Sequence, residues 1–457
     1  MDGVNSTMQV SRMPARGGDR LPLVFMDESG FHEGVLANFK GVISACQVSP
    51  LVKYGEFSSG RRQFVHRRLG ELGDDKGYLV LGLFGNPTNW FGADGTGTPP
   101  LSQLIPDLRP LLDRHRGLQL LIDYSWEAGL GEGFFSGMDA FLRDIGVDPG
   151  RVVVLVSNQG IEERLVRYLR AQKREASRCF RVIGADLWLM YSAVELQRKH
   201  WYGAPETLVL ETEIEARCRT LRPRKFLSFN RRPRWQRFLF ALMVGRLGLE
   251  RQAFISMSSP EYRGDWVPED SRIDEYGALM SGDRWRALKS VRERVFASLP
   301  WTIDINMDAH SGRPEAYLYH TQDRQLFLDS YSQVITESYM EGEPVDVFIT
   351  EKTCRALGNL QPFLVFGHSG MLRRLRQHGF ESSAFFDDTY DGIVDLGERL
   401  DRLYDAMEEL SAASIRDLHE RYHADLDVLR FNRRRLFEMP EVLAERVAAR
   451  LHAELWA

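Results

Sequence analysis

Two short polar turns, fourteen residues apart, carry the residue types best suited to binding chemistry. Thr336-Glu337 follows the apolar run SQVIT, while Thr350-Glu351 follows DVFIT and leads through Lys352 into a helix-like segment. Open α/β sheets bind ligands at the carboxyl ends of their strands, and the free N–H groups of a following helix favour anions. The pattern therefore predicts two strands that end in polar turns at a ligand-binding edge.

The same turns also have an ordinary structural interpretation. Thr is a common helix cap and Glu a common partner of the helix dipole, so one Thr-Glu-Lys turn alone is a weak signal. The pair of turns is followed by a third apolar run, residues 362–367, and then by HSG. This longer pattern is more specific than either turn.

These motifs resemble those of the α-1,3-fucosyltransferase family and its bacterial and viral relatives. That family carries a Phe-Glu-Asn-Ser turn, an Ile-Thr-Glu-Lys turn, a helix and a strand containing Pro-Val-Val. Here the first turn reads Ile335-Thr336-Glu337-Ser338 and lacks the Phe and the Asn, so the motif does not specify fucose. The resemblance covers residues 222–390.

The resemblance implies a role for each matching residue. It places Glu351 on the ribose hydroxyls and Glu337, as a catalytic-site carboxylate, near the sugar of a nucleotide-sugar donor. Thr336, Ser338 and Thr350 belong to the same two turns and are expected to line the donor site.

A basic cluster precedes these turns. Residues 222–237 contain seven Arg or Lys and no carboxylate, around the turn between the strand FLSFN and a helix. Forked Arg donors beside a helix N-terminus suit a diphosphate, although most Arg runs are solvated faces. The family's donor domain opens with a similar strand, so the resemblance adds four donor-binding residues here: Asn230, Arg231, Arg232 and Arg237. With Lys352, these cations would neutralise the leaving diphosphate.

The general base is expected from the other half of the chain. Glu127 follows the buried-strand pattern at residues 118–123 and lies in a turn that contains Trp126. Asp123 and Glu28 are the alternatives, and a plain surface glutamate is the ordinary interpretation of Glu127.

Composition limits the classes of protein that remain. The chain has 457 residues, 43% hydrophobic and 27% charged, and a net charge of −5, which disfavours bulk binding to nucleic acid or an anionic membrane. Its four cysteines lack CxxC spacing, so neither a zinc site nor a disulfide framework is indicated. No apolar run is long enough to span a membrane, and we expect a cytoplasmic protein.

Strand and helix patterns alternate through the chain, which predicts parallel sheets. We expect two Rossmann-like α/β domains that face a cleft, the GT-B arrangement, with C-terminal helices. The expected parts are a leader at 1–20, an acceptor-side domain at 21–210, a nucleotide-sugar domain at 222–394 and a helical extension at 395–457. Residues 346–350 and 301–306 are expected to be strands, and residues 238–249 an amphipathic helix.

The sequence lacks several competing motifs. It has no dinucleotide fingerprint in the right place, no P-loop, no HExxH or GxSxG and no convincing metal-binding aspartate pair. We therefore expect a metal-independent inverting glycosyltransferase without a cofactor, acting on a nucleoside-diphosphate sugar, with a GDP-sugar favoured, and a glycan acceptor. A noncatalytic nucleotide-sugar or polysaccharide-binding protein is the alternative, and net acidity weighs against a nucleic-acid binder.

Overall fold

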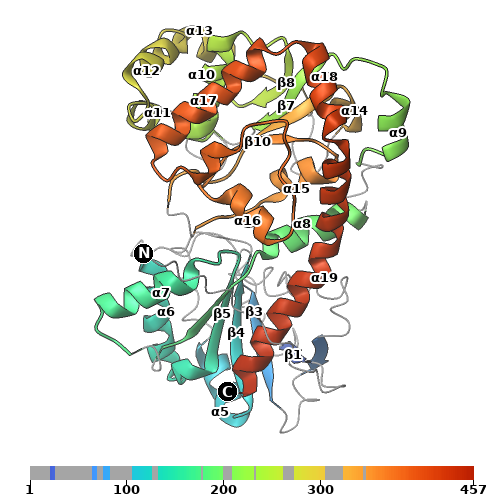
Figure 1. The fold of residues 1–457 in the computed structure, drawn as a ribbon. Coiled ribbons are helices and arrows are strands. Elements are labelled where there is room, and N and C mark those ends of the chain that lie inside the picture. Colours follow the sequence, from blue (N-terminus) through green and yellow to red (C-terminus); the bar gives the residue numbers. More distant parts are fainter. Residues whose placement is uncertain are drawn as a thin grey trace, which may run out of the picture.

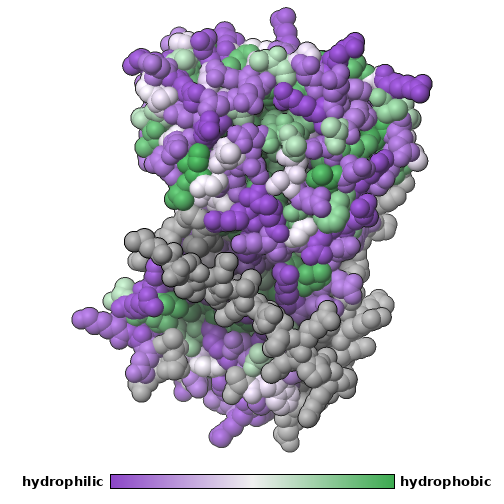
Figure 2. Space-filling model, viewed as in Figure 1, coloured by the Kyte–Doolittle hydropathy of each residue, from purple (hydrophilic) through white to green (hydrophobic). Residues whose placement is uncertain are grey.

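The computed structural model contains two parallel α/β units, one above the other in Figure 1. The structure describes residues 21–25, 64–68, 76–82, 105–125, 132–175, 179–198, 208–230, 233–260, 272–303, 323–342 and 346–456. The expected fold class, two Rossmann-like α/β domains followed by C-terminal helices, is confirmed. On the face shown in Figure 2, hydrophilic side chains cover most of the described surface.

The N-terminal sheet has six strands in the order β2-β1-β3-β4-β5-β6, and every pair in it is parallel. The strands are β1 (Leu21–Phe25), β2 (Phe64–Arg68), β3 (Gly77–Gly82), β4 (Leu118–Tyr124), β5 (Val152–Val156) and β6 (Arg181–Gly184). Its helices are α5 (Ile105–Arg114), α6 (Glu132–Ile145), α7 (Ile161–Ala171) and α8 (Leu187–Arg198). Five of the six strands coincide with apolar runs in the sequence, while β2, with the sequence FVHRR, does not.

Strands β3, β4 and β5 are buried on both faces of the sheet, which explains why they are almost entirely apolar. Alternate side chains enter different cores: Tyr78 and Val80 pack in the core that contains α8, while Leu79 and Leu81 pack against α5, α6 and α7. The long helix α19 (Leu426–Trp456) also covers the α8 side.

The C-terminal sheet has four parallel strands in the order β10-β9-β7-β8. They are β7 (Arg224–Asn230), β8 (Ala253–Met257), β9 (Ser330–Thr336) and β10 (Phe363–Phe366). The chain winds outward from β7 to β8 in one direction and from β9 to β10 in the other. The topological switch point therefore lies between β7 and β9.

Helices surround the second sheet on both sides. They are α9 (Glu211–Ala216), α10 (Trp235–Leu247), α11 (Arg272–Gly277), α12 (Gly282–Lys289), α13 (Arg292–Ala297), α14 (Arg324–Leu328), α15 (Glu351–Gly358), α16 (Met371–Gln377), α17 (Leu396–Ala412) and α18 (Ile415–Ala424). Short 3-10 turns occur at Pro149–Arg151 and Thr389–Gly392. No helix in the described part of the chain is long and apolar enough to cross a membrane.

Two local predictions were wrong, and of the predicted strand at 301–306 the structure describes only residues 301–303. Residues 346–350 belong to no strand; the next strand, β10, pairs directly with β9 and leaves no place between the two. Helix α10 is buried on every side from Trp235 to Gly245 rather than amphipathic, because α11, α12, α13 and α17 cover the side away from the sheet. Of residues 301–303, which the structure describes, only Trp301 makes a β-bridge, with Met257.

Helix α19 connects the two units. It begins beside the C-terminal sheet and returns along the N-terminal one (Figure 1). In its last turns, the Leu451 carbonyl accepts a hydrogen bond from the buried Tyr78 hydroxyl (2.8 Å), and Glu454 forms an ion pair with Arg181 (2.7 Å). The C-terminal segment is therefore part of the N-terminal unit's core.

A buried charge cluster joins the units at a second place. Asp186, between β6 and α8, is 2% exposed, and its Oδ2 atom accepts from Gln159 (2.9 Å), Arg374 Nε (2.8 Å) and His378 Nε2 (2.6 Å). Burial alone would raise the pKa of Asp186, but the His378 hydrogen bond and the Arg374 charge outweigh it, and the pKa is lowered. The carboxylate is therefore held in its charged form.

Asp186→Asn should destabilise the protein by about 3 kcal/mol, because it removes the counter-charge of the largely covered Arg374 and the acceptor of the buried His378. Differential scanning calorimetry at neutral pH measures this loss. A pKa lowered in the folded state gives stability that is present above the unfolded pKa of about 4 and is lost as the pH falls through the folded pKa. The difference in the free energy of unfolding between wild type and Asp186→Asn should therefore shrink below about pH 4.

Asp283→Asn is the matched control, because Asp283 also pairs with an arginine but its side chain is 91% exposed. It should change stability by at most about 0.5 kcal/mol. Equal effects of the two substitutions would contradict a special role for the Asp186 cluster.

Candidate functional site

The switch point of the C-terminal sheet brings together two of the predicted residues. Asn230 ends β7 and Thr336 ends β9, and these strands are parallel neighbours. The buried Asn230 amide accepts a hydrogen bond from Thr336 Oγ1 and donates one to Ser228 Oγ (2.9 Å). The two strand ends are thus fixed to each other at the edge where open sheets bind ligands.

Glu337 is the centre of this edge. Its side chain is almost fully buried, and its carboxylate accepts hydrogen bonds from Thr350 Oγ1 (2.5 Å) and Thr353 Oγ1 (2.8 Å) and a long one from the Thr350 N–H (3.4 Å). Its own N–H donates to the Phe366 carbonyl (2.9 Å). The first polar turn therefore holds the second one, and the start of α15, against the end of β9.

Thr350 caps α15, as the sequence predicts for a Thr before a helix. Its Oγ1 atom accepts from the Lys352 N–H (3.3 Å) while donating to Glu337. Lys352 Nζ lies 3.2 Å from that same oxygen, 3.0 Å from Glu351 Oε1 and 3.8 Å from Glu337 Oε2. The carboxylates of Glu337 and Glu351 thus balance the Lys352 ammonium, which we expected to face a diphosphate. The Lys352 side chain is only 16% exposed.

Glu351 contacts the N-terminal unit. Its Oε2 atom accepts from the indole N–H of Trp188 on α8 (3.0 Å), and the Trp188 ring lies 6.1 Å from the Phe348 ring. Burial alone would raise the pKa of Glu351, but Lys352, Arg355 and the Trp188 hydrogen bond hold it well below its usual range. A permanently charged acceptor therefore lies where the two units meet.

Neighbouring side chains support the first turn from α10 and α17. Gln236 donates to the backbone carbonyls of Glu337 (2.9 Å) and Ser338 (3.4 Å), and buried Arg399 donates to the Met340 carbonyl (2.7 Å). Beside them the Arg234 guanidinium lies over the Tyr339 ring at 5.0 Å. This pair supplies a cation and a half-buried aromatic ring near the carboxyl edge of the sheet.

The expected basic cluster is divided between the two ends of β7. A strand of seven residues spans about 20 Å, so Arg222, Arg224 and Lys225 lie far from Asn230. Arg222 stacks on Tyr422 at 3.8 Å, and Lys225 donates to the Ser411 carbonyl at 2.6 Å. Arg222 and Lys225 therefore hold α18 and α17 in place. Residues 222–237 do not form one anion site.

Of the cations at the other end, Arg237 is 3% exposed inside α10. Arg231 and Arg232 lie outside the described residues.

The loop after β10 adds residues that sequence reasoning missed. His368 is 7% exposed, burial lowers its pKa to about 4, and its Nδ1 atom has no hydrogen-bond partner among the described residues. Beside it Gly342, at φ 125°, leaves no room for a side chain, since a Cβ atom there would lie 2.9 Å from His368 Cε1. Nearby Asp346 binds Arg164 and Asn158 (3.3 Å) of the N-terminal unit.

Of the three predicted bases, the structure describes only Asp123, at the carboxyl edge of the other sheet. Asp123 is fully buried, and its Oδ1 atom accepts hydrogen bonds from the Ser125 N–H (3.1 Å) and from the Ser125 hydroxyl. The Ser125 hydroxyl also lies 2.7 Å from the Tyr191 hydroxyl. That geometry suits a structural carboxylate better than a solvent-facing base. Glu127 and Glu28 lie outside the residues that the structure describes.

The described part of the chain contains no group of three or more His, Cys, Asp or Glu side chains that could hold a metal ion. Sequence reasoning also missed Trp188, Thr353 and Gln236 as site residues. Thr353, three residues after Thr350, and Gln236, next to Arg237, lie on the helices that follow the predicted turns, whereas Trp188 comes from α8, which no sequence pattern connected to the site.

Comparisons with known proteins give limited information. No known family model and no curated protein matches the sequence. Among solved structures, an α,α-trehalose-phosphate synthase (UDP-forming) from Burkholderia vietnamiensis is 11% identical, with a TM-score of 0.40, and the match covers 95% of this chain and 100% of that one. A similar synthase from Burkholderia multivorans is 12% identical, with a TM-score of 0.39 and coverage of 95% and 98%. At these values the likeness identifies neither a donor nor a reaction.

Proposed function

We propose that the protein is a glycosyltransferase that moves a sugar from a nucleoside-diphosphate donor, with a GDP-sugar favoured, to a hydroxyl of a glycan. The observation that carries this proposal is the cluster at the switch point, where Glu337 holds the Thr350-Glu351-Lys352 turn against the ends of β7 and β9. This cluster lies at the sheet edge where a nucleotide is expected to bind. It contains the start of α15, the Lys352 cation and the charged Glu351 carboxylate.

The polar groups of the cluster suggest how a donor would bind. Ribose hydroxyls would donate to Glu351, whose lowered pKa keeps it an acceptor. Lys352 would then exchange its contact with Glu351 for a phosphate oxygen, a move of the ammonium group that does not disturb the Thr350 cap. Arg234 is near enough to the same edge to add a second positive charge.

The reaction would be a direct displacement with inversion. The acceptor oxygen bonds to the anomeric carbon, the bond from that carbon to the diphosphate breaks, and the acceptor's proton passes to a carboxylate. Because hydroxyl donors occupy both oxygens of Glu337, we assign it to positioning rather than to proton transfer. The base in this proposal is Glu127, from the other unit.

One observation favours a noncatalytic binding protein as the second candidate. Glu337, Glu351 and Lys352 satisfy one another within the chain, as in a structural cluster. Assaying donor hydrolysis and transfer over a panel of nucleotide sugars separates the two. Turnover of any donor supports the enzyme, whereas binding without turnover supports the alternative.

Lys352→Ala should weaken nucleoside-diphosphate binding by about 1.5–3 kcal/mol, the range for a charge-assisted hydrogen bond. Isothermal titration calorimetry with GDP and UDP measures the change. Lys289→Ala is the control, because Lys289 is a half-exposed partner of Asp274 remote from the switch point. Unchanged affinity in a folded Lys352→Ala protein would rule out the diphosphate role.

Transfer should continue in EDTA, because in this proposal side-chain cations neutralise the leaving group instead of a metal ion. The test compares initial rates before and after dialysis against the chelator. Complete loss of activity that Mg²⁺ or Mn²⁺ restores would refute metal-independent transfer.

Glu127→Gln should lower turnover by about 10²–10⁴-fold, the usual contribution of a general base, with little change in donor affinity. Asp123→Asn and Glu28→Gln test the alternatives, and Glu163→Gln, exposed on α7, is the control. A defect confined to Asp123→Asn or Glu28→Gln would reassign the base. Normal turnover in all three variants would show that the N-terminal unit does not supply it.

A further inference from the structure

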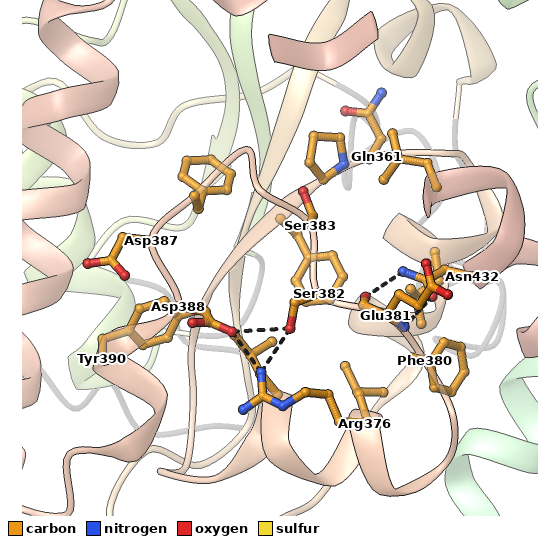
Figure 3. A pocket seen from close by; sticks show the side chains of 17 residues that line it. Gln361, Arg376, Phe380, Glu381, Ser382, Ser383, Asp387, Asp388, Tyr390 and Asn432 are labelled. Carbon is orange, nitrogen blue, oxygen red and sulfur yellow. Dashed lines mark hydrogen bonds and ion pairs between the residues drawn. The ribbon is translucent and has the colours of Figure 1, made fainter. Parts of the chain in front are cut away.

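A pocket lies away from the switch point. It is at the beginning of β10, walled by α16, the segment 380–390 and the first turns of α19 (Figure 3). Phe363 starts β10 at the pocket, whereas Phe366 ends it beside Glu337, so the two sites are separated by about 10 Å along the strand. The roles proposed above do not involve this pocket.

The pocket has an apolar floor and a polar rim. Its floor consists of aliphatic and aromatic side chains that include Leu375, Phe363 and Phe380. At the rim, Arg376 Nη1 donates to Asp388 Oδ2 (2.7 Å) and Ser382 Oγ (2.9 Å), as Figure 3 shows. These groups form a connected set on one side of the opening.

The wall is firmly held, so the pocket is preformed. The side chain of Asn432 on α19 pairs with both backbone groups of Glu381, accepting from its N–H (2.8 Å) and donating to its carbonyl (2.9 Å). The Asp425 carboxylate accepts from the backbone N–H groups of Ala384 and Phe385 at 3.2 Å each. A ligand would meet a fixed shape, which lowers the entropic cost of binding.

Charge excludes one class of ligand. The pocket lining contains one guanidinium, from Arg376, against three carboxylates, from Glu381, Asp387 and Asp388. Hydrogen bonds from Thr389 lower the pKa of Asp387, which keeps that group charged at neutral pH. A net negative rim repels phosphates and nucleotides, so this is not a second donor site.

The polar groups further distinguish a sugar from an organic amine. An amine donates hydrogen bonds only, and would leave the Arg376 donors without a new partner. A sugar hydroxyl both donates and accepts, so one ring can bind the carboxylates, the Ser382 hydroxyl and the guanidinium together while its C–H face packs on the floor. We propose that this pocket binds one neutral sugar unit of a glycan.

Saturation-transfer NMR on the full chain tests this, with methyl α-glucoside, methyl β-galactoside and maltotriose as probes and glucose 6-phosphate as the charged comparison. At least one neutral probe should bind with a Kd in the millimolar range, and the phosphate should bind more weakly. Absence of transfer from every neutral probe, or stronger transfer from the phosphate, would overturn the proposal.

Two variants locate the signal. Arg376→Gln should weaken binding about tenfold, and Ser382→Trp, at the exposed rim, should abolish it. Arg373→Gln is the matched control, an exposed arginine on the same helix that does not line the pocket. Unchanged binding in the first two variants, with melting temperatures intact, would overturn the assignment.

Competition separates this site from the donor site. Saturating GDP or UDP should leave the sugar signal unchanged, as should Lys352→Ala. If either removes the signal, the sugar binds at the switch point and the pocket proposal fails. Because no turnover is measured, the result does not depend on whether the protein is an enzyme.

Discussion

The hydrogen bonds that the Glu337 carboxylate accepts from Thr350 and Thr353 are the interaction on which the proposed site depends. Burying a carboxylate is costly unless its oxygens are satisfied, and here two hydroxyls and a backbone N–H satisfy them. This requirement places the start of α15 against β9, and with it Glu351 and Lys352. The same contact explains why a segment outside the sheet can still belong to its carboxyl edge.

Carboxylates also join the two units. Asp186, Asp346 and Glu351 each pair across the boundary, with Arg374, Arg164 and Trp188 respectively. Buried charges of this kind tolerate little misalignment, because a displaced partner leaves the other charge desolvated. The units are therefore held in one relative position, and the proposed donor edge of one stays close to α8 of the other. Helix α19 reinforces this by packing in the continuous core that extends from the α8 side of the N-terminal sheet into the C-terminal unit.

The sequence predicted the parallel strands well, because strands buried on both faces are continuous apolar runs. It failed at 346–350, where the same β-branched composition occurs in a segment that lies outside the sheet. The sequence singled out the two Thr-Glu turns, which the structure brings together, but it predicted neither their mutual hydrogen bonds nor the pairing of Lys352 with two carboxylates. Contacts such as Trp188 with Glu351, 163 residues apart, follow from how the two units pack, which local patterns do not encode.

A crystal structure with a bound nucleoside diphosphate is the most direct test of the central claim, that the edge organised by Glu337 is the donor site. The account predicts density for the diphosphate at the carboxyl ends of β7 and β9, with Lys352 turned from Glu351 toward a phosphate oxygen and ribose hydroxyls on Glu351. Density elsewhere, with the Glu337, Glu351 and Lys352 contacts unchanged, would show that the cluster is structural and contradict the account.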